Sequence, residues 1–290
     1  MKKIIPYILT LPLIMILAIL ITGLINGIIQ SLGYIPALGL EEISLDYYKE
    51  IIGNPHFRDS LLLSLYTCLL SSVLSVIIGV GICALLTYSG KGEGLFNYIL
   101  RIPILIPHTV VAFFSVVIFS QSGMISRLMY LMGLIGDPME FPNLLYNTSG
   151  TGIILAYVWK QAPFVAFFVL SLMESIKKTL EEASVNLGAS PIKAFFTITL
   201  PLSMPSILKA SLIITAFSFG AYELPFLLGA TKPRALPVQA YIEYTHPDLK
   251  HRPYAMAANG IIIIVSMVIA VSYYLIANKK IWGMRESDEK

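Results

Sequence analysis

Six long runs of apolar residues constrain this chain more than any other feature of its sequence. A helix needs roughly 20 apolar residues to cross the hydrocarbon of a bilayer. Backbone amides find no water there, so each crossing segment has to form its own hydrogen bonds as a helix. Only 13% of the residues are charged and 56% are hydrophobic, whereas soluble domains carry roughly 25% charged residues. We therefore predict an all-α membrane protein with six transmembrane helices, at about residues 5–29, 60–88, 102–120, 152–173, 207–229 and 255–277.

The first run could also be a secretory signal peptide, because lysines precede it. Its uncharged part extends from Ile4 to Ile29, whereas the apolar region of a signal peptide is about 7–15 residues long. We interpret residues 1–29 as an uncleaved first transmembrane helix. Residues 1–290 then form a single transmembrane domain with its core at about residues 59–278.

The placement of lysine and arginine predicts the orientation in the membrane. With the N-terminus inside, twelve of these residues lie on the cytoplasmic side and seven outside, and Lys160 is left within a helix. We therefore predict that both termini are cytoplasmic. The net charge of +3 gives no support for nucleic acid as a partner, so membrane lipid is the expected surrounding.

The sequence predicts neither a metal site nor a catalytic one. Cys68 and Cys83 have no CxxC spacing, and the histidines form no Ser/His/Asp or HExxH arrangement. The chain also lacks the GxxxxGK[ST] motif that holds ATP phosphates. We expect a protein that is not an enzyme in its own right and that binds no cofactor itself.

The long connection at residues 174–206 has a regular pattern. Gly188 suits a helix end, Ser190 an N-cap and Pro191 a first helical position, and Leu200-Pro201 predicts the end of a second short helix. We predict a cytoplasmic helix–turn–helix that exposes Glu181 and Glu182 beside small residues. A partnerless amphipathic hairpin at the membrane surface is the alternative.

The spacing in this connection resembles the EAA signature of ABC-importer permeases. Glu182, Ala183, Gly188, Ile198 and Leu200-Pro201 match in register, and Ser184 replaces the second alanine. The resemblance implies the type I ABC importer permease fold, in which this hairpin couples to an ATPase. The ATPase-coupling residues it implies are Glu182, Ala183, Ser184, Gly188, Ala189, Ile198, Leu200 and Pro201.

The same resemblance implies partners. These are an ABC ATPase dimer that carries ATP and Mg²⁺, a second permease subunit (homologous or identical), and an extracytoplasmic solute-binding protein. The location it implies is the bacterial cytoplasmic (inner) membrane. An ion-coupled secondary transporter is the main alternative, but such proteins usually show inverted repeats, and none is evident here.

Polar residues inside spans are costly and often functional. Lys160 could bind an anionic solute, pair with an acid such as Glu223, or reach the outer interface. Glu223 follows Gly220 and precedes Pro225, which could break the fifth span locally. His108 could equally be a hydrogen-bonded packing residue. The candidates for the solute path are Trp159, Lys160, Gln161, Tyr222, Glu223 and His108.

The solute itself is suggested only by a weaker resemblance. The segment from Phe219 to Gly229 looks like the spermidine/putrescine-type branch of these permeases. This implies a polyamine-like solute, with phosphonate, sulfate, iron or thiamine as alternatives. Glu223 favours a cation, whereas Lys160 argues against one.

Overall fold

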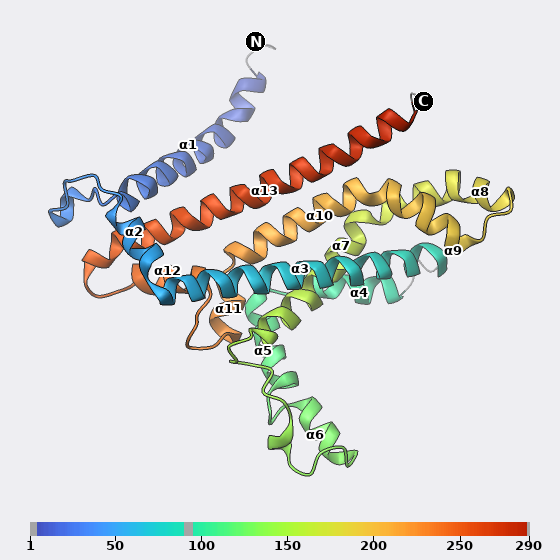
Figure 1. Cartoon of the computed structure of the whole chain (residues 1–290), viewed down its shortest axis with the longest axis horizontal. Coiled ribbons are helices and arrows are strands. Elements are labelled where there is room, and N and C mark those ends of the chain that lie inside the picture. The colour runs from blue at the N-terminus through green and yellow to red at the C-terminus, as the bar shows by residue number, and fades with distance from the viewer. Residues whose placement is uncertain (1–4, 90–94, 289–290) are drawn as a thin grey trace. The chain divides into compact units, whose positions relative to one another are not determined.

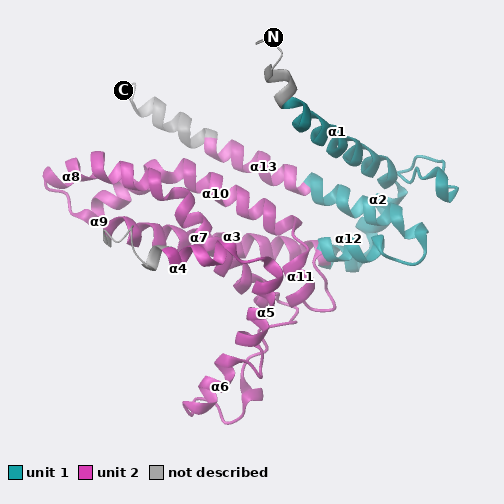
Figure 2. Ribbon diagram, turned by 180° about the vertical axis from the view of Figure 1, so that it is seen from behind, with its two compact units in different colours: residues 1–59, 236–264 teal, residues 60–235, 265–290 magenta. Residues whose placement is uncertain are grey.

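The computed structural model describes residues 5–89 and 95–288, and these residues are helical apart from turns and one isolated bridge between Ile35 and Leu40 (Figure 1). Two compact units divide the chain (Figure 2). Unit 1 contains residues 1–59 and 236–264, and unit 2 contains residues 60–235 and 265–290. Helices α3 and α13 each run from one unit into the other.

Unit 1 holds together through its tyrosines. Tyr48 donates a hydrogen bond to Ser31 over 2.8 Å, and Tyr254 donates to Glu50 over 2.5 Å. The ring of Tyr47 packs edge-on against that of Tyr254, with 5.0 Å between centroids. The elements of this unit are α1 (Ile5–Ser31), η1 (Pro36–Leu38), α2 (Asp46–Gly53), the start of α3 (Pro55–Ser89), α12 (Leu236–Tyr244), η5 (Leu249–His251) and the start of α13 (Arg252–Asp288).

Unit 2 contains most of the membrane-spanning helices. Its elements after α3 are α4 (Leu95–Leu105), α5 (His108–Phe119), α6 (Met124–Leu131), η2 (Pro138–Glu140), α7 (Thr151–Ile176), η3 (Lys177–Glu181), α8 (Glu182–Asn186), α9 (Pro191–Ala194), η4 (Phe195–Thr199), α10 (Leu200–Gly220) and α11 (Glu223–Leu228). Of these, η2 is a 3-10 turn, whereas η3 and η4 are single π turns.

The described residues contain six segments that are long and apolar enough to cross a membrane, as predicted. They are Thr10–Ser31, Pro55–Tyr88, His108–Leu131, Thr151–Asn186, Pro191–Gly220 and Leu249–Ala277. The all-α fold class and the number of spans are therefore confirmed. The described residues include no β-strand.

The third span differs from its prediction at residues 102–120, because the helix breaks between α4 and α5. Pro107 has no N–H to continue the helix and disfavours helical dihedrals at Ile106. The backbone instead turns at Pro107, whose φ and ψ are −58° and 148°. The break suggested for the fifth span is present, between Gly220 and Glu223.

Helix α7 lies at the centre of unit 2 and contacts α4, α5, α10 and α11. Val165, Ala166, Val169 and Met173 are completely buried. Because α7 carries apolar residues on nearly every side, it is buried as a core helix in its middle part. Helix α7 therefore forms the support for the break between α4 and α5 and for the break between α10 and α11.

Close packing of α3 on α7 depends on Gly79. A Cβ there would lie 2.6 Å from the Ala162 carbonyl oxygen and 2.7 Å from Val165 Cβ, whereas a Cβ at Gly81 would meet nothing within 4 Å. We expect Gly79→Leu to destabilise the protein by about 1–3 kcal/mol through overpacking. Gly81→Leu, the matched control, should change stability by no more than about 0.5 kcal/mol. Thermal denaturation of both variants in detergent tests this, and equal melting temperatures would contradict it.

Candidate functional site

Residues 177–199, which we call the α8–α9 hairpin, form the predicted helix–turn–helix (Figure 1). Its turn has Gly188 at a φ of +99°, a left-handed conformation that glycine adopts without strain. Ser190 caps α9 by accepting a hydrogen bond from the Lys193 N–H over 3.4 Å, and Pro191 is in the first turn. The capping residues predicted from the sequence are confirmed.

The second helix of the hairpin does not end at Leu200-Pro201, as predicted, but continues into α10. In a regular α-helix the Pro201 ring would meet the carbonyl of Thr197, four residues earlier. Thr197 lies in the π turn η4, and a π turn is wider than an α turn. The wider turn gives the ring room, so the chain passes through the proline without ending the helix.

The tip of the hairpin exposes apolar side chains. Leu187 is 90% exposed, Ile192 74% and Phe196 61%. Ile192 and Phe196 also line a hollow of about 200 Å³, together with Ala84, Tyr88, Pro191 and Phe195. Exposed apolar groups gathered at one place on a protein mark an interaction surface.

The implied coupling residues divide into two groups. Glu182, Ala183 and Gly188 are exposed near the turn, beside the half-buried Ser184 and Ala189. Ile198, Leu200 and Pro201 are half-buried at the junction with α10. The first group can contact a partner directly, whereas the second group shapes the connection behind it.

Glu181 is buried, not exposed as predicted, with 2% of its surface accessible. One of its carboxyl oxygens, Oε2, accepts hydrogen bonds from the hydroxyls of Tyr88 and Thr199. Nearby, Lys177 Nζ donates to the Thr87 carbonyl over 2.9 Å. The prediction failed because Glu181 ends the π turn η3, which rotates it toward the interior relative to a regular helix.

Lys160 supports the break between α4 and α5. Its Nζ donates to the carbonyl oxygens of Pro103, over 3.2 Å, and of Ile106. In an unbroken helix the Pro103 carbonyl would accept from residue 107, but Pro107 has no N–H. A cation near a helix C-terminus also interacts favourably with the helix dipole. The suggested pairing of Lys160 with Glu223 is thus replaced by bonds to backbone oxygens.

The break between α10 and α11 receives support from the same part of α7. Tyr157 donates to the Ser218 carbonyl over 3.5 Å, and Gln161 Nε2 donates to Ser218 Oγ over 2.5 Å. Ser75 of α3 in turn donates to Gln161 Oε1 over 3.4 Å. Gln161 is therefore a buried structural residue, and α7 supports both breaks within little more than one turn.

His108 and Glu223 lie together where α5 and α11 begin. His108 Nδ1 is 3.8 Å from a Glu223 carboxyl oxygen, and the Glu223 side chain is 55% exposed. The His108 ring stacks on Phe217, with 5.2 Å between centroids. Tyr222 stacks on Phe226 at 4.9 Å. The structure thus brings together His108 and Glu223 at the breaks, where the side chains of both are partly accessible.

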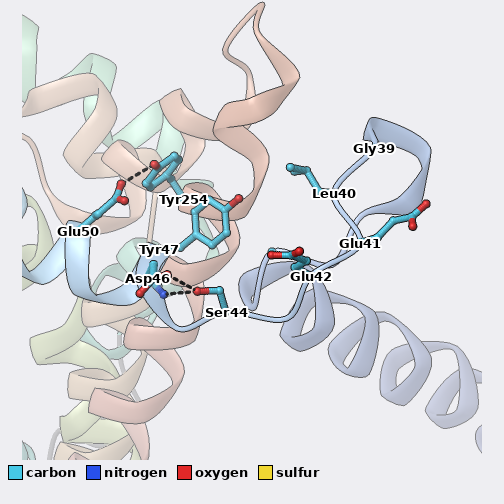
Figure 3. Close-up of a pocket in the computed structure, with 10 residues that line it drawn as sticks. Gly39, Leu40, Glu41, Glu42, Ser44, Asp46, Tyr47, Glu50 and Tyr254 are labelled. Atoms are coloured by element: carbon cyan, nitrogen blue, oxygen red, sulfur yellow. Dashed lines mark hydrogen bonds between the residues drawn. The ribbon is translucent and has the colours of Figure 1, made fainter.

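Sequence reasoning missed a pocket in unit 1, although the run of acidic residues at 41–50 was a visible signal (Figure 3). It has a volume of about 490 Å³ and is lined by Gly33, Gly39, Leu40, Glu41, Glu42, Ser44, Asp46, Tyr47, Glu50 and Tyr254. A hydrogen bond from Ser44, together with Lys49, lowers the pKa of Asp46. Because its lining contains four carboxyls and no basic residue, the pocket is strongly acidic.

Residues 60–283 match the protein family described as "Binding-protein-dependent transport system inner membrane component". The chain belongs to this family. This match confirms the family resemblance that the sequence of the α8–α9 hairpin indicated. The permease is a multi-pass membrane protein with the fold of ABC importer permeases.

Curated relatives of the permease transport different solutes. It is 26% identical to the sn-glycerol-3-phosphate transport system permease protein UgpA of Pectobacterium atrosepticum, over 69% of this chain and 68% of that protein. It is 27% identical to the glucose import system permease protein GlcT of Saccharolobus solfataricus, over 80% of this chain and 82% of GlcT. It is 29% identical to the maltose/maltodextrin permease MalF of Klebsiella aerogenes, over 74% of this chain and 41% of MalF.

Solved structures show the same fold. The permease superposes on a bacterial ABC transporter involved in the import of the acidic polysaccharide alginate, with a TM-score of 0.79 and 20% identity, over 96% of this chain and 98% of that one. The MetNI methionine ABC transporter gives a TM-score of 0.55 and 17% identity, over 76% of this chain and 94% of that one. At these identities the likeness establishes the fold alone.

Proposed function

We propose that this chain is the permease subunit of an ATP-driven importer and passes a small solute, delivered by an external binding protein, across the membrane. The observation that carries this proposal is the α8–α9 hairpin. Its exposed turn is joined through continuous helices to α7 and α10. A force applied at the turn therefore reaches the helices that contain or support both breaks.

The partners in this proposal follow from surfaces and family. Exposed Leu187 and Ile192 suit an ATPase subunit, which would carry the ATP and Mg²⁺. Exposed apolar groups on unit 2, such as Phe113 and Leu105, suit lipid and a second permease subunit. An ion-coupled secondary transporter would give the hairpin no role. With the hairpin turned toward a cytoplasmic ATPase, both termini would be cytoplasmic.

We further propose a carbohydrate-like solute in place of the expected polyamine. A polyamine carries several positive charges, but Glu223 is the only acidic residue in α4, α5, α10 and α11 as described, and Lys160 adds a positive charge nearby. Ligand sites for neutral molecules combine aromatic rings with a few polar groups. Phe217, which stacks on His108, and Phe226, which stacks on Tyr222 beside Glu223, provide this combination with the polar atoms of His108 and Glu223. Trp159 of α7 is a further exposed aromatic residue.

The relatives support this choice. UgpA, GlcT and MalF are named for glycerol phosphate, glucose and maltose. None of these three is a polyamine permease. The chain is also 26% identical to the molybdenum transport system permease protein ModB of Escherichia coli. An oxyanion is therefore included among the solutes that the experiment compares.

The experiment is uptake into proteoliposomes that contain the permease with its ATPase and second permease, plus the binding protein outside. We test labelled glucose, maltose, glycerol 3-phosphate, molybdate and spermidine. We expect ATP-dependent uptake of a sugar, and Glu223→Gln should lower that uptake by no more than about tenfold, since the amide keeps hydrogen-bonding capacity. Glu140→Gln in the 3-10 turn η2 is the control.

The outcomes separate the two parts of the proposal. Uptake of spermidine alone, abolished by Glu223→Gln, would refute the carbohydrate and leave the importer intact. Uptake of molybdate alone would also refute the carbohydrate. Uptake that needs an ion gradient and no ATP would refute the importer itself.

A further inference from the structure

The α8–α9 hairpin has covalent connections to only two of the helices beside it. Its first arm continues through η3 into α7, and its second arm continues through η4 into α10. Helix α3 ends at Ser89 and belongs to neither arm. A movement of the hairpin therefore reaches α7 and α10 through the backbone, but it reaches α3 only through side-chain contacts.

Those contacts converge on one buried carboxyl group. Tyr88, at the end of α3, and Thr199, at the end of η4, both donate a hydrogen bond to Oε2 of Glu181, which ends η3. The three residues thus connect three separate segments at a single oxygen. Among the described residues, Tyr88 and Thr199 are the side chains that donate hydrogen bonds to this carboxyl.

Three further contacts hold the end of α3 at this place. Lys177 Nζ lies 4.7 Å from the centroid of the Tyr88 ring and donates to the Thr87 carbonyl over 2.9 Å. The Tyr88 ring also packs edge-on against Phe195, with 5.9 Å between centroids. Both arms of the hairpin therefore contact the last residues of α3.

A buried acid is a costly way to join three segments if stability alone is at stake. Burial removes water from a carboxyl group, and well-packed apolar residues often stabilise as well or better. The carboxyl group adds geometric specificity, because hydrogen bonds to it are strong and hold the donors in a fixed geometry. We infer that Glu181 is a positioning residue that makes α3 move together with the α8–α9 hairpin.

This link gives α3 a role at the second helix break. Ser75 of α3 bonds to Gln161, which bonds to Ser218 near the end of α10. Ser75 and Tyr88 are 13 residues apart on one helix, about 20 Å at 1.5 Å per residue. Between them, Gly79 packs closely on α7. A displacement of α3 at Tyr88 would therefore also move Ser75, and with it the hydrogen bonds through Gln161 that support the break between α10 and α11.

The inference rests on the proposed function, because an ATPase has to move the hairpin. We test it in the assembled complex by pulsed electron paramagnetic resonance, with spin labels at Ile77→Cys on α3 and Leu180→Cys on the hairpin. Both positions are exposed, and the native Cys68 and Cys83 are completely buried. Distances are measured without nucleotide and with ATP trapped on the ATPase.

In the otherwise unchanged complex we expect the distance between the labels to shift by less than about 2 Å between the two states, the size of ordinary helix adjustments. Glu181→Leu should give a larger shift or a second distance in the ATP state. Tyr88→Phe should do the same, because it removes the hydroxyl on α3. Thr199→Val should not, because it removes only the contact to η4. Thr179→Val, on the same π turn without contact to α3, is the control.

An equally large shift in the unchanged complex and in Glu181→Leu would overturn the inference, and so would equal effects of Tyr88→Phe and Thr199→Val. If Glu181→Leu fails to assemble, Tyr88→Phe decides the matter alone. A complete absence of ATPase binding to the unchanged permease would refute the proposed function as well, which separates the two failures.

Discussion

Leu187→Asp is expected to abolish co-purification of the ATPase with the permease. Leu187 lies at the turn of the α8–α9 hairpin and is 90% exposed, so little of its side chain packs within the chain itself. An exposed apolar residue at the centre of an interface can contribute 2 kcal/mol or more, which is roughly a 30-fold change in the dissociation constant. A carboxylate buried there without a partner costs more. Affinity purification of the permease, followed by quantification of the bound ATPase, measures the loss.

Two controls show whether the interface or the fold is responsible. Leu187→Met keeps an apolar side chain of similar size and should retain the ATPase. Leu187→Asp itself should melt close to the unchanged protein, since exposed substitutions alter stability by about 0.5 kcal/mol or less. Gly188→Arg is a less direct test, because Gly188 has a φ of +99° and any side chain there adds strain. ATPase retained by Leu187→Asp would mean that the hairpin turn is not the docking surface.

The hairpin could be predicted because its signals are local. Gly188, Ser190 and Pro191 act within a few residues, through backbone conformation and capping, and the structure uses each of them as expected. The spacing of the EAA signature added the family, which the match over residues 60–283 confirms. Apolar runs predicted the spans for the same reason, since the bilayer requires length and composition more than particular partners.

The sequence predictions failed for residues whose position depends on a contact with a distant part of the chain. The helix–turn–helix pattern predicts an exposed Glu181, but Tyr88 of α3 and a π turn bring it inside. Lys160 could not be assigned from sequence, because its acceptors are backbone oxygens more than fifty residues away. The break at Pro107 was visible in the sequence. The apolar run continues through it, so composition alone predicts one unbroken span.

Lys160→Met is expected to destabilise the permease by about 3 kcal/mol. Methionine keeps the apolar stem of lysine but cannot donate, so the carbonyls of Pro103 and Ile106 lose their partner. Each unsatisfied buried acceptor costs about 1–3 kcal/mol, and few waters are available at membrane depth to replace the donor. For a chain of this size, such a loss lowers the melting temperature by roughly 6–12 °C.

Thermal denaturation and solute uptake together decide what Lys160 does. Lys160→Arg keeps the positive charge and the donors, so it should melt closer to the unchanged protein than Lys160→Met does. The alternative role, binding an anionic solute, makes the opposite prediction. In that case Lys160→Met would keep its melting temperature and raise the KM for uptake. A loss of stability in Lys160→Met that Lys160→Arg largely restores would assign Lys160 to the break between α4 and α5, because its hydrogen bonds within the described part of the chain go to the carbonyl oxygens there.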